Sequence, residues 1–434
     1  MSKAQRLRLG VSVAVAALGY FVDLYDIVIF GVVRVASLQA LGLEGPAVTE
    51  WGIRLLNLQM IGMLLGGVAW GLAADRYGRR PILFATIATY SVANLANAAV
   101  DSIAAYALLR FLAGFGLAGE LGIGVTLVAE ALPARRRGWG ATVIAVMGLL
   151  GALSASYVGG DLSWRAAYLA GGGLGLLVLT GRFFGVEESR IFRAQQTHAS
   201  ATPLPALLRA PVLARLCAVV LVGVPIWYVS ALFVNLAPET GRALAVAAPL
   251  SVAEVLRWQA FGLALGSALV GAGSEFFGNR RFVIATCFVG LVVGIGFLYG
   301  ARGLSPAAYG AALFFLGLAQ GYWTPFVTLA AEQFGADIRA TAATVVPNLV
   351  RGATVPVTLA WQALAPRLGP DHALLALGLA IMAAAFLALA RLQETYGWDL
   401  DYRGLMTAEE ARRLLAERHG TRQDGSRPAS YPEA

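Results

Sequence analysis

Charged side chains interrupt several stretches of the chain that are otherwise apolar: Asp23, Asp26, Arg110, Glu120 and Arg351. Asp23 and Asp26 are one helical turn apart near the middle of the first stretch. An ionisable residue at such a depth is costly, so it normally faces a polar cavity and has a function. The carboxylates could take up and release protons, and the guanidinium groups could bind an anion.

Two further features extend this set. Arg34 lies eleven residues after Asp23, which returns it to nearly the same helical face. Glu120 precedes Glu130 by ten residues, a rise of about 15 Å, or half the hydrocarbon thickness. Helical spacing also predicts one polar stripe, facing protein or water, formed by Thr344, Asn348, Arg351, Thr358 and Gln362. The alternative is a purely structural ion pair of Arg351 with Glu120 or an aspartate.

Aromatic residues occur at a matching depth in the second half of the chain. Trp227 and Tyr228 follow Pro225, and Tyr322 and Trp323 precede Pro325. Aromatic faces can stack on flat or sugar-like groups and can hold cations. We therefore expect these four residues to form the aromatic side of a cavity; the alternative is ordinary packing between helices.

The composition is that of a membrane protein with many spans. Hydrophobic residues make up 58% and charged residues 13%, and the mean hydropathy is +0.69. A soluble domain usually carries about 25% charged residues. The net charge of +8 does not indicate nucleic-acid binding, because the arginines lie in short loops rather than on one face.

Arginine-rich and arginine-poor loops alternate along the chain, as the positive-inside rule expects. This pattern predicts a multi-pass protein of the cell (inner) membrane with both termini in the cytoplasm. No cleavable signal peptide is recognisable, so the first span would serve as its own anchor. Basic residues of the expected cytoplasmic loops include Arg76, Arg135, Arg190 and Arg280; the opposite loops carry Glu44, Asp101, Asp161 and Glu239.

Histidine is absent from the interior of the expected spans, since His372 lies near an outer helix end, so proton coupling would have to use carboxylates. Cys217 and Cys287 lie in apolar runs without metal-ligand spacing and are interpreted as core residues. The sequence has no catalytic Ser/His/Asp set, no metal cluster and no phosphate-binding glycine loop followed by lysine. We therefore expect neither an enzyme nor a bound metal or cofactor.

Twelve apolar segments are long enough to span a membrane. Residues 1–184 would form a first six-helix bundle, 185–210 a cytoplasmic linker, 211–391 a second bundle and 392–434 a cytoplasmic tail. The expected spans are 10–33, 52–73, 81–100, 104–130, 138–158, 164–184, 212–236, 252–273, 282–301, 306–332, 340–364 and 371–391.

The two halves repeat each other. A charged loop, Gly71-Leu72-Ala73-Ala74-Asp75-Arg76-Tyr77-Gly78-Arg79-Arg80, returns in variant form at residues 271–281, and the segment 125–130 returns at 327–332. This loop resembles the signature of the major facilitator superfamily of secondary transporters. The resemblance implies an all-α membrane protein of twelve helices in two pseudo-symmetric bundles, with a monomeric transport unit.

The resemblance also implies a set of gating charges at the cytoplasmic helix ends. These would pair across the interface in one state and separate in the other. Phe276 and Asn279 replace basic positions in the second loop, so the second set should hold more weakly; the alternative is a role in topology alone. The set comprises Gly71, Asp75, Arg76, Gly78, Arg79, Arg80, Glu130 and Arg137 in the first half, and Glu275, Arg280, Arg281, Glu332 and Arg339 in the second.

Within the superfamily, the segment from Arg110 to Glu120 and the Asp23-Leu24-Tyr25-Asp26 motif resemble the metabolite–proton symporters. Sugar-porter features are also present after the sixth and twelfth spans, as Glu188-Ser189-Arg190 and Glu394-Thr395-Tyr396-Gly397. The paired glutamines of sugar porters in the seventh helix are missing.

The expected function is proton-coupled symport of a small polar metabolite, an organic anion, across the lipid bilayer. Arg351 would bind its carboxylate, and Glu120 with Asp23 or Asp26 would carry the proton. One alternative is a proton antiporter that exports a metabolite or drug. Another is a receptor or assembly component built on a transporter scaffold.

Overall fold

The structure is a computed structural model that describes residues 3–131, 137–185, 209–300, 303–335 and 338–397. Its regular structure is helical throughout, with no strand among these residues. The first half contains α1 (Lys3–Ala40), α2 (Pro46–Tyr77), α3 (Arg79–Asn97), α4 (Ile103–Ala131), α5 (Arg137–Asp161) and α6 (Trp164–Gly185). The second contains α9 (Ala210–Tyr228), the π-helix η2 (Val229–Asn235), α10 (Ala237–Ala243), α11 (Val252–Phe277), α12 (Arg280–Gly300), α13 (Pro306–Gln320), α14 (Trp323–Glu332), α15 (Arg339–Gly352), α16 (Thr354–Leu368) and α17 (Pro370–Arg391).

All twelve expected spans fall on helices. Some helices run beyond the apolar segment, as α1 does at both of its ends, because a helix continues past the hydrocarbon into the headgroup region. Seven helical segments among the described residues are long and apolar enough to cross a membrane by length and composition. The predicted linker falls largely on residues 186–208 and the tail on 398–434, which lie outside the described residues.

Three expected spans of the second half are interrupted rather than continuous. Pro225 lies within α9 just before the chain changes to the wider π-helix η2. Pro325 lies in the first turn of α14, just after one break, and Pro356 lies in the first turn of α16, just after the break at Ala353. Proline removes a backbone donor and crowds the preceding turn, so the breaks before Pro325 and Pro356 have a local cause in the sequence.

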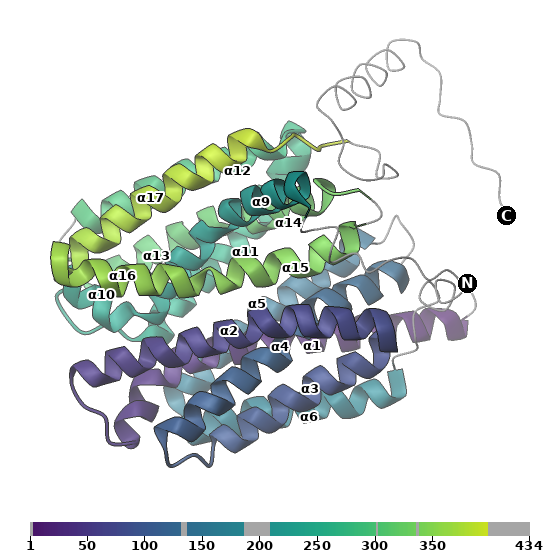
Figure 1. The fold of residues 1–434 in the computed structure, drawn as a ribbon, viewed down its shortest axis with the longest axis horizontal. Helices are drawn as coiled ribbons and strands as arrows, with labels where there is room; N and C mark the ends of the chain where they lie inside the picture. The colour runs from purple at the N-terminus through teal and green to yellow at the C-terminus, as the bar shows by residue number, and fades with distance from the viewer. Residues whose placement is uncertain (1–2, 132–136, 186–208, 301–302, 336–337, 398–434) are drawn as a thin grey trace, which may run out of the picture.

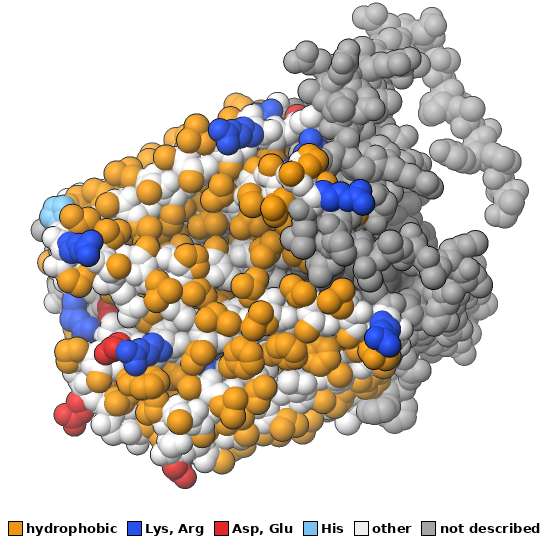
Figure 2. Space-filling view, viewed as in Figure 1, with side chains coloured by type: hydrophobic (Ala, Val, Ile, Leu, Met, Phe, Trp, Pro, Cys, Tyr) orange, Lys and Arg blue, Asp and Glu red, His pale blue; other side chains and the backbone are white. Residues whose placement is uncertain are grey.

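Buried apolar side chains form two main clusters, one in each half. The cluster of the first half is built mainly on α1, α2, α4 and α6, and that of the second on α9, η2, α12, α13 and α17. Figure 1 shows the two halves as two layers of roughly parallel helices, with α15 lying along α2 where they meet. On the face seen in Figure 2, hydrophobic side chains cover the middle and most charged side chains lie toward the ends.

Glycines bring helices into backbone contact at equivalent places in the two halves. A Cβ at Gly62 or Gly66 of α2 would meet the backbone of α4, and one at Gly262 or Gly266 of α11 would meet the backbone of α13. Small residues at this four-residue spacing allow close packing of helices in membranes. The α2–α4 and α11–α13 pairs are therefore structural counterparts, as the repeat in the sequence predicts.

The repeated charged loop makes a tight turn in both halves. Gly78 has φ 99° between α2 and α3, and Gly278 has φ 60° at the end of α11. A positive φ of this kind strongly favours glycine over other residues. The turn glycines of the motif are thus required by the backbone.

Candidate functional site

The charged residues singled out in the apolar segments are buried where the helices pack. Asp23, Asp26, Arg110, Glu120 and Arg351 each expose 2% of their surface or less. Such groups need partners, because an isolated charge in an apolar interior is very costly. The partners differ from one residue to the next and divide the set into separate sites.

Arg351 of α15 and Asp23 of α1 meet across the two halves. Arg351 Nη2 lies 3.4 Å from Asp23 Oδ2. The remaining donor Nη1 of Arg351 and the remaining oxygen Oδ1 of Asp23 are buried without a hydrogen-bond partner among the described residues. A guanidinium and a carboxylate usually form a bidentate pair, so this single long contact leaves binding capacity on both sides.

Two neutral hydrogen bonds flank this ion pair along the same helical stripe. Asn348 donates from Nδ2 to the carbonyl oxygen of Ala118 at 3.1 Å. Thr358 donates to Asn57 Oδ1 at 2.7 Å. Both contacts join α15 or α16 to the first half. The described part of the polar stripe therefore faces protein at Asn348, Arg351 and Thr358, as predicted, and we call these three contacts the polar seam.

Asp26 and Arg110 form a second group inside the first half. Arg110 donates to Asn94 Oδ1 at 2.6 Å and lies over the ring of Tyr168, 4.8 Å from its centroid. Arg110 is also the cation whose charge acts on Asp26. Neither carboxylate oxygen of Asp26 accepts a hydrogen bond by distance and angle within the described residues. A Cβ added at Gly171 would come within 2.7 Å of Asp26 Oδ1, so α6 passes close to this carboxylate.

Glu120 is held inside the first half by Arg182 of α6. Arg182 donates from Nη1 to Glu120 Oε2 at 3.2 Å, and its Nη2 contacts Oε1. Of the two ion pairs considered for Arg351 as the structural alternative, the pair with Glu120 is not formed, whereas a pair with an aspartate, Asp23, is. Sequence reasoning missed Arg182 because it lies in the last turn of an expected span and matches no motif.

Arg34 does not join the central group. Its Nη2 donates to Glu239 Oε2 at 2.8 Å and to the carbonyl oxygen of Asn235 at 3.3 Å. Thr49 donates to the other oxygen of Glu239 at 3.0 Å. We call Arg34, Thr49 and Glu239 the terminal clasp. The helical face common to Asp23 and Arg34 did not identify the partner, and Glu239 had been interpreted only as a loop charge.

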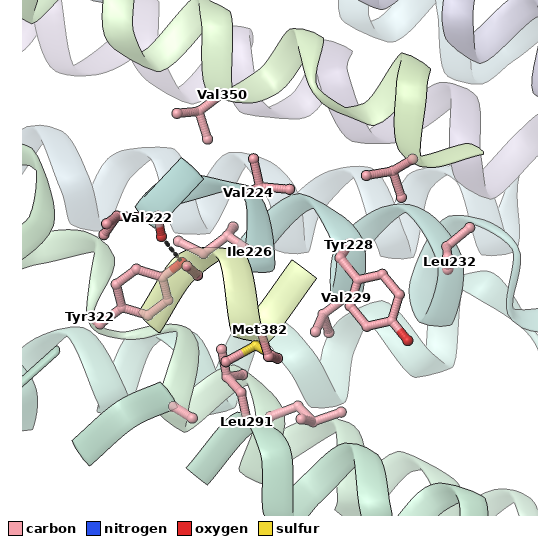
Figure 3. Packing of buried hydrophobic residues seen from close by; sticks show 14 of the residues in the cluster. Val222, Val224, Ile226, Tyr228, Val229, Leu232, Leu291, Tyr322, Val350 and Met382 are labelled. Carbon is pink, nitrogen blue, oxygen red and sulfur yellow. Dashed lines mark hydrogen bonds between the residues drawn. The ribbon is translucent and has the colours of Figure 1, made fainter. Parts of the chain in front are cut away.

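The expected aromatic side of a cavity needs correction at both tyrosines. Tyr228 and Tyr322 are fully buried in the hydrophobic cluster of the second half, where Figure 3 shows them among aliphatic side chains. Their hydroxyls donate to the backbone oxygens of Leu374 at 2.6 Å and Val222 at 2.9 Å. These contacts satisfy the hydroxyls within the packed core, which is the packing alternative.

The two tryptophans are less enclosed. Trp227 is half-buried and packs against the hydrophobic clusters of both halves, which places it where the halves meet. Trp323 is half-buried against Phe326, with ring centroids 5.2 Å apart. Trp227 is thus the only one of the four aromatics that contacts both clusters within the described part of the chain.

The predicted gating residues of the second half lie close together at the end of the bundle where α17 ends. Arg280 forms an ion pair with Glu332 and donates to Thr395 at 3.2 Å. The backbone N–H of Arg281 donates to Glu394 at 2.8 Å. Arg339 donates to the carbonyl oxygen of Phe334 at 3.1 Å.

The remaining predicted gating residues are Glu275 and those of the first half. The hydroxyl of Tyr396 lies 3.4 Å from Glu275 Oε2. Arg76 is exposed and stacks on Tyr77 at 5.4 Å, and Gly71 has open space around it. The side chains of Asp75, Arg79, Arg80, Glu130 and Arg137 lie outside the description, so the first-half latch stays a prediction.

Two repeated halves of membrane-crossing helices that meet at buried charges are the architecture of secondary transporters. The chain belongs to the Major Facilitator Superfamily, whose sequence pattern matches residues 16–353. A D-xylose–proton symporter has the same fold, with a TM-score of 0.67 at 19% identity, over 89% of this chain and 99% of that one. The family assignment and the twelve-helix fold predicted from the sequence are thereby confirmed.

Relatives in sequence are transporters rather than enzymes. A proposed niacin/nicotinamide transporter of Bacillus subtilis (strain 168) is 33% identical over 173 residues, which cover 39% of this chain and 42% of the relative. The 4-hydroxybenzoate transporter PcaK of Pseudomonas aeruginosa is 31% identical over 161 residues, 35% of this chain and 36% of the relative. These matches therefore span about two-fifths of the relatives' length.

Proposed function

We propose that the protein is a secondary active transporter of a small organic anion, a carboxylic acid that carries an aromatic ring. The observation that carries this proposal is Arg351, a cation buried between the two halves with a donor that no described residue uses. Arginine is well suited to carboxylate recognition because its planar fork matches the two oxygens. Trp227, half-buried where the halves meet, supplies an apolar face for a ring.

The names of the relatives support the same substrate class. Two of the three compounds in these names, niacin and 4-hydroxybenzoate, are carboxylates on a flat six-membered ring, and the third, nicotinamide, is the neutral amide of the same ring as niacin. A xylose carrier of the same fold, in contrast, has an uncharged substrate. Arg351 favours the acid class, because its buried Nη1 has no partner among the described residues and a carboxylate would supply both an acceptor and the opposite charge.

We further propose that transport is coupled to protons. The symporter with the same fold supports this proposal. Two buried carboxylates support it as well, because Oδ1 of Asp23 and both oxygens of Asp26 accept no hydrogen bond from the described residues. Glu120 is a weaker candidate than the sequence indicated, because Arg182 occupies both of its oxygens. A group that must gain and lose a proton needs a partner it can leave.

Alternating access would use contacts between the halves that can be made and broken. The polar seam and the terminal clasp are such contacts, whereas the network around Arg280 lies within the second half. The positive-inside pattern supports cytoplasmic termini, so the clasp would lie on the outer side.

Uptake of labelled benzoate, 4-hydroxybenzoate and nicotinate into proteoliposomes tests this function. The matched neutral probes are nicotinamide and benzyl alcohol. We expect pH-gradient-driven uptake of at least one acid and little uptake of the neutral probes. Arg351→Gln should abolish uptake of the acid, and Arg351→Lys should keep part of it. Preferred transport of the neutral probes by the wild type would contradict the substrate class.

A further inference from the structure

We propose that Arg257 of α11 binds the phosphate of a membrane phospholipid where the two halves meet, at a site that does not depend on which solute is carried. The guanidinium carbon of Arg257 lies 4.4 Å from the centroid of the Tyr157 ring, which belongs to α5 of the first half. A Cβ added at Gly160 would come within 3.3 Å of Arg257 Nη2, so the backbone of α5 also passes close to the guanidinium. One cation thus contacts both halves at the end of the bundle where α5 ends and α11 begins.

Arg257 differs from two other arginines at the same end of the bundle, which also stack on an aromatic ring but pair with a carboxylate as well. They are Arg54, over Trp51 and paired with Glu50, and Arg165, over Trp164 and paired with Asp101. Within the described part of the chain, Arg257 has no ion pair, and its buried Nε has no hydrogen-bond partner. The nearby carboxylate of Glu254, three residues earlier on α11, is exposed and does not pair with it. The protein therefore supplies the ring but not the anion.

Arg257 lies at the edge of the lipid-facing side of α11. Large exposed side chains recur on this helix at three- and four-residue spacing, which marks the side turned toward lipid. They are Trp258, Phe261, Leu265 and Leu269. Ala253, one turn before Arg257, is buried and faces Gly160 of α5. Arg257 itself is half-buried, and Tyr157 is exposed. The cation therefore lies between the lipid-facing side and the first half, where a lipid headgroup can reach it.

The level of Arg257 along α11 is within reach of the lipid phosphates. The helix has 26 residues and is about 39 Å long, whereas the hydrocarbon core is about 30 Å thick. Arg257 follows the first helical residue, Val252, by five positions, a rise of about 7.5 Å. If the excess length is shared between both ends, its Cα lies about 3 Å inside the hydrocarbon. Arginine side chains at this depth extend toward the headgroups, and an exposed tryptophan such as Trp258 is typical of the same level.

A phosphate group would supply the anion that Arg257 lacks. The Tyr157 ring covers one face of the guanidinium, while the N–H groups point outward from its edge and match the oxygens of a phosphate. The site is complete only while α5 and α11 are close together, because each helix provides part of it. A bound phospholipid should therefore favour the conformation in which this end of the bundle is closed. The lipid composition of the membrane would then influence the balance between conformations.

Native mass spectrometry of the full chain with palmitoyl-oleoyl phosphatidylglycerol tests this site. Diacylglycerol with the same acyl chains is the matched probe without a phosphate. Arg257→Gln should weaken binding of the phosphatidylglycerol about tenfold, the loss typical of one hydrogen bond to a charged group, and leave diacylglycerol binding unchanged. Arg54→Gln and Arg165→Gln are the matched controls, because both arginines already have a carboxylate partner, and both variants should bind the lipid as the wild type does. Equal losses in all three variants, or no loss with Arg257→Gln, would overturn the inference.

Two further measurements identify the occupant and its effect. Inorganic phosphate and 4-hydroxybenzoate should not displace the phosphatidylglycerol, and displacement by either would assign Arg257 to a small anion instead. A phosphatidylglycerol with a photoreactive headgroup should crosslink the wild type near Tyr157 and Arg257; crosslinks only elsewhere would refute the site without the need for a folded variant. In a Cys217→Ser background, added phosphatidylglycerol should slow labelling of Ala253→Cys, whereas diacylglycerol should not. Unchanged labelling would refute the effect on conformation.

Discussion

Arg34 of α1 and Glu239 of α10 form an ion pair of 2.8 Å whose side chains are almost completely buried. The pair joins the two halves at the end of the bundle opposite to the one where α1 begins and α17 ends (Figure 1). Thr49 of α2 binds the second oxygen of Glu239, so the clasp connects three helices. Glu239 lies in the first turn of α10, shortly after η2 ends at Asn235, which links the clasp to the interrupted seventh span.

Breaking the clasp should favour the conformation in which this end is open. Arg34→Gln would leave Glu239 buried without its cation, a change that typically costs about 3–5 kcal/mol in the closed state. Cysteine at Ala253 is a suitable reporter, because this residue is buried and faces Gly160 across the halves. In a background with Cys217→Ser, Arg34→Gln should speed labelling of Ala253→Cys. The exchanged pair Arg34→Glu with Glu239→Arg should reverse part of the effect, and unchanged labelling in all variants would argue against a clasp.

Glu120 and Arg182 should act in stability rather than in coupling. Glu120→Gln leaves Arg182 buried with a charge that nothing balances, so the melting temperature in detergent should fall by several degrees. The double variant Glu120→Gln with Arg182→Met should recover most of this loss and retain pH-gradient-driven uptake. Loss of coupling in a double variant that is as stable as the wild type would return Glu120 to the list of proton carriers.

The glycine contacts predict a position-specific loss of stability. Gly262→Ala would push a methyl group into the backbone of Phe314 and separate α11 from α13. Gly273→Ala, on the same helix, meets no atom within 4 Å. We expect the first substitution to lower the melting temperature clearly and the second to leave it unchanged. Equal effects would mean that the close approach of the two helices contributes little.

Orientation in the membrane is testable with two exposed loop positions. Asp101 lies between α3 and α4, and Asn279 lies between α11 and α12. In intact cells carrying a Cys217→Ser background, an impermeant reagent should label Asp101→Cys and spare Asn279→Cys. Permeabilised cells should label both, which controls for reactivity. The opposite pattern in intact cells would place the termini outside.

The sequence predicted the helices well because spans leave a strong local signal. Apolar length located all twelve, and the repeated loop located the turn glycines. The rule that buried charges usually have a function directed attention to Asp23 and Arg351, which the structure brings into contact. Pairing could not be read in the same way, since Arg182 and Glu239 lie near helix ends and their partners are far away in sequence.

The sequence repeat relates Glu120 to Tyr322 but did not predict the contacts that the two side chains make. Tyr322 occupies the position equivalent to Glu120, and both are buried inside their own half. The error was to assume that this position faces a cavity, when Tyr322 bonds Val222 and Glu120 bonds Arg182.

Close backbone contacts between helices predict two different effects of substitutions. These contacts are made at Gly62, Gly66, Gly262 and Gly266. Helices whose backbones are in contact cannot slide past each other without a steric collision, so we expect each half to move as a rigid body. The change between conformations would then take place at the few polar contacts between the two halves. Substitutions inside one half should change how much protein accumulates in the cell. Substitutions at the contacts between the halves, at Arg34, Thr358 or Arg351, should change the rate of transport at normal protein abundance.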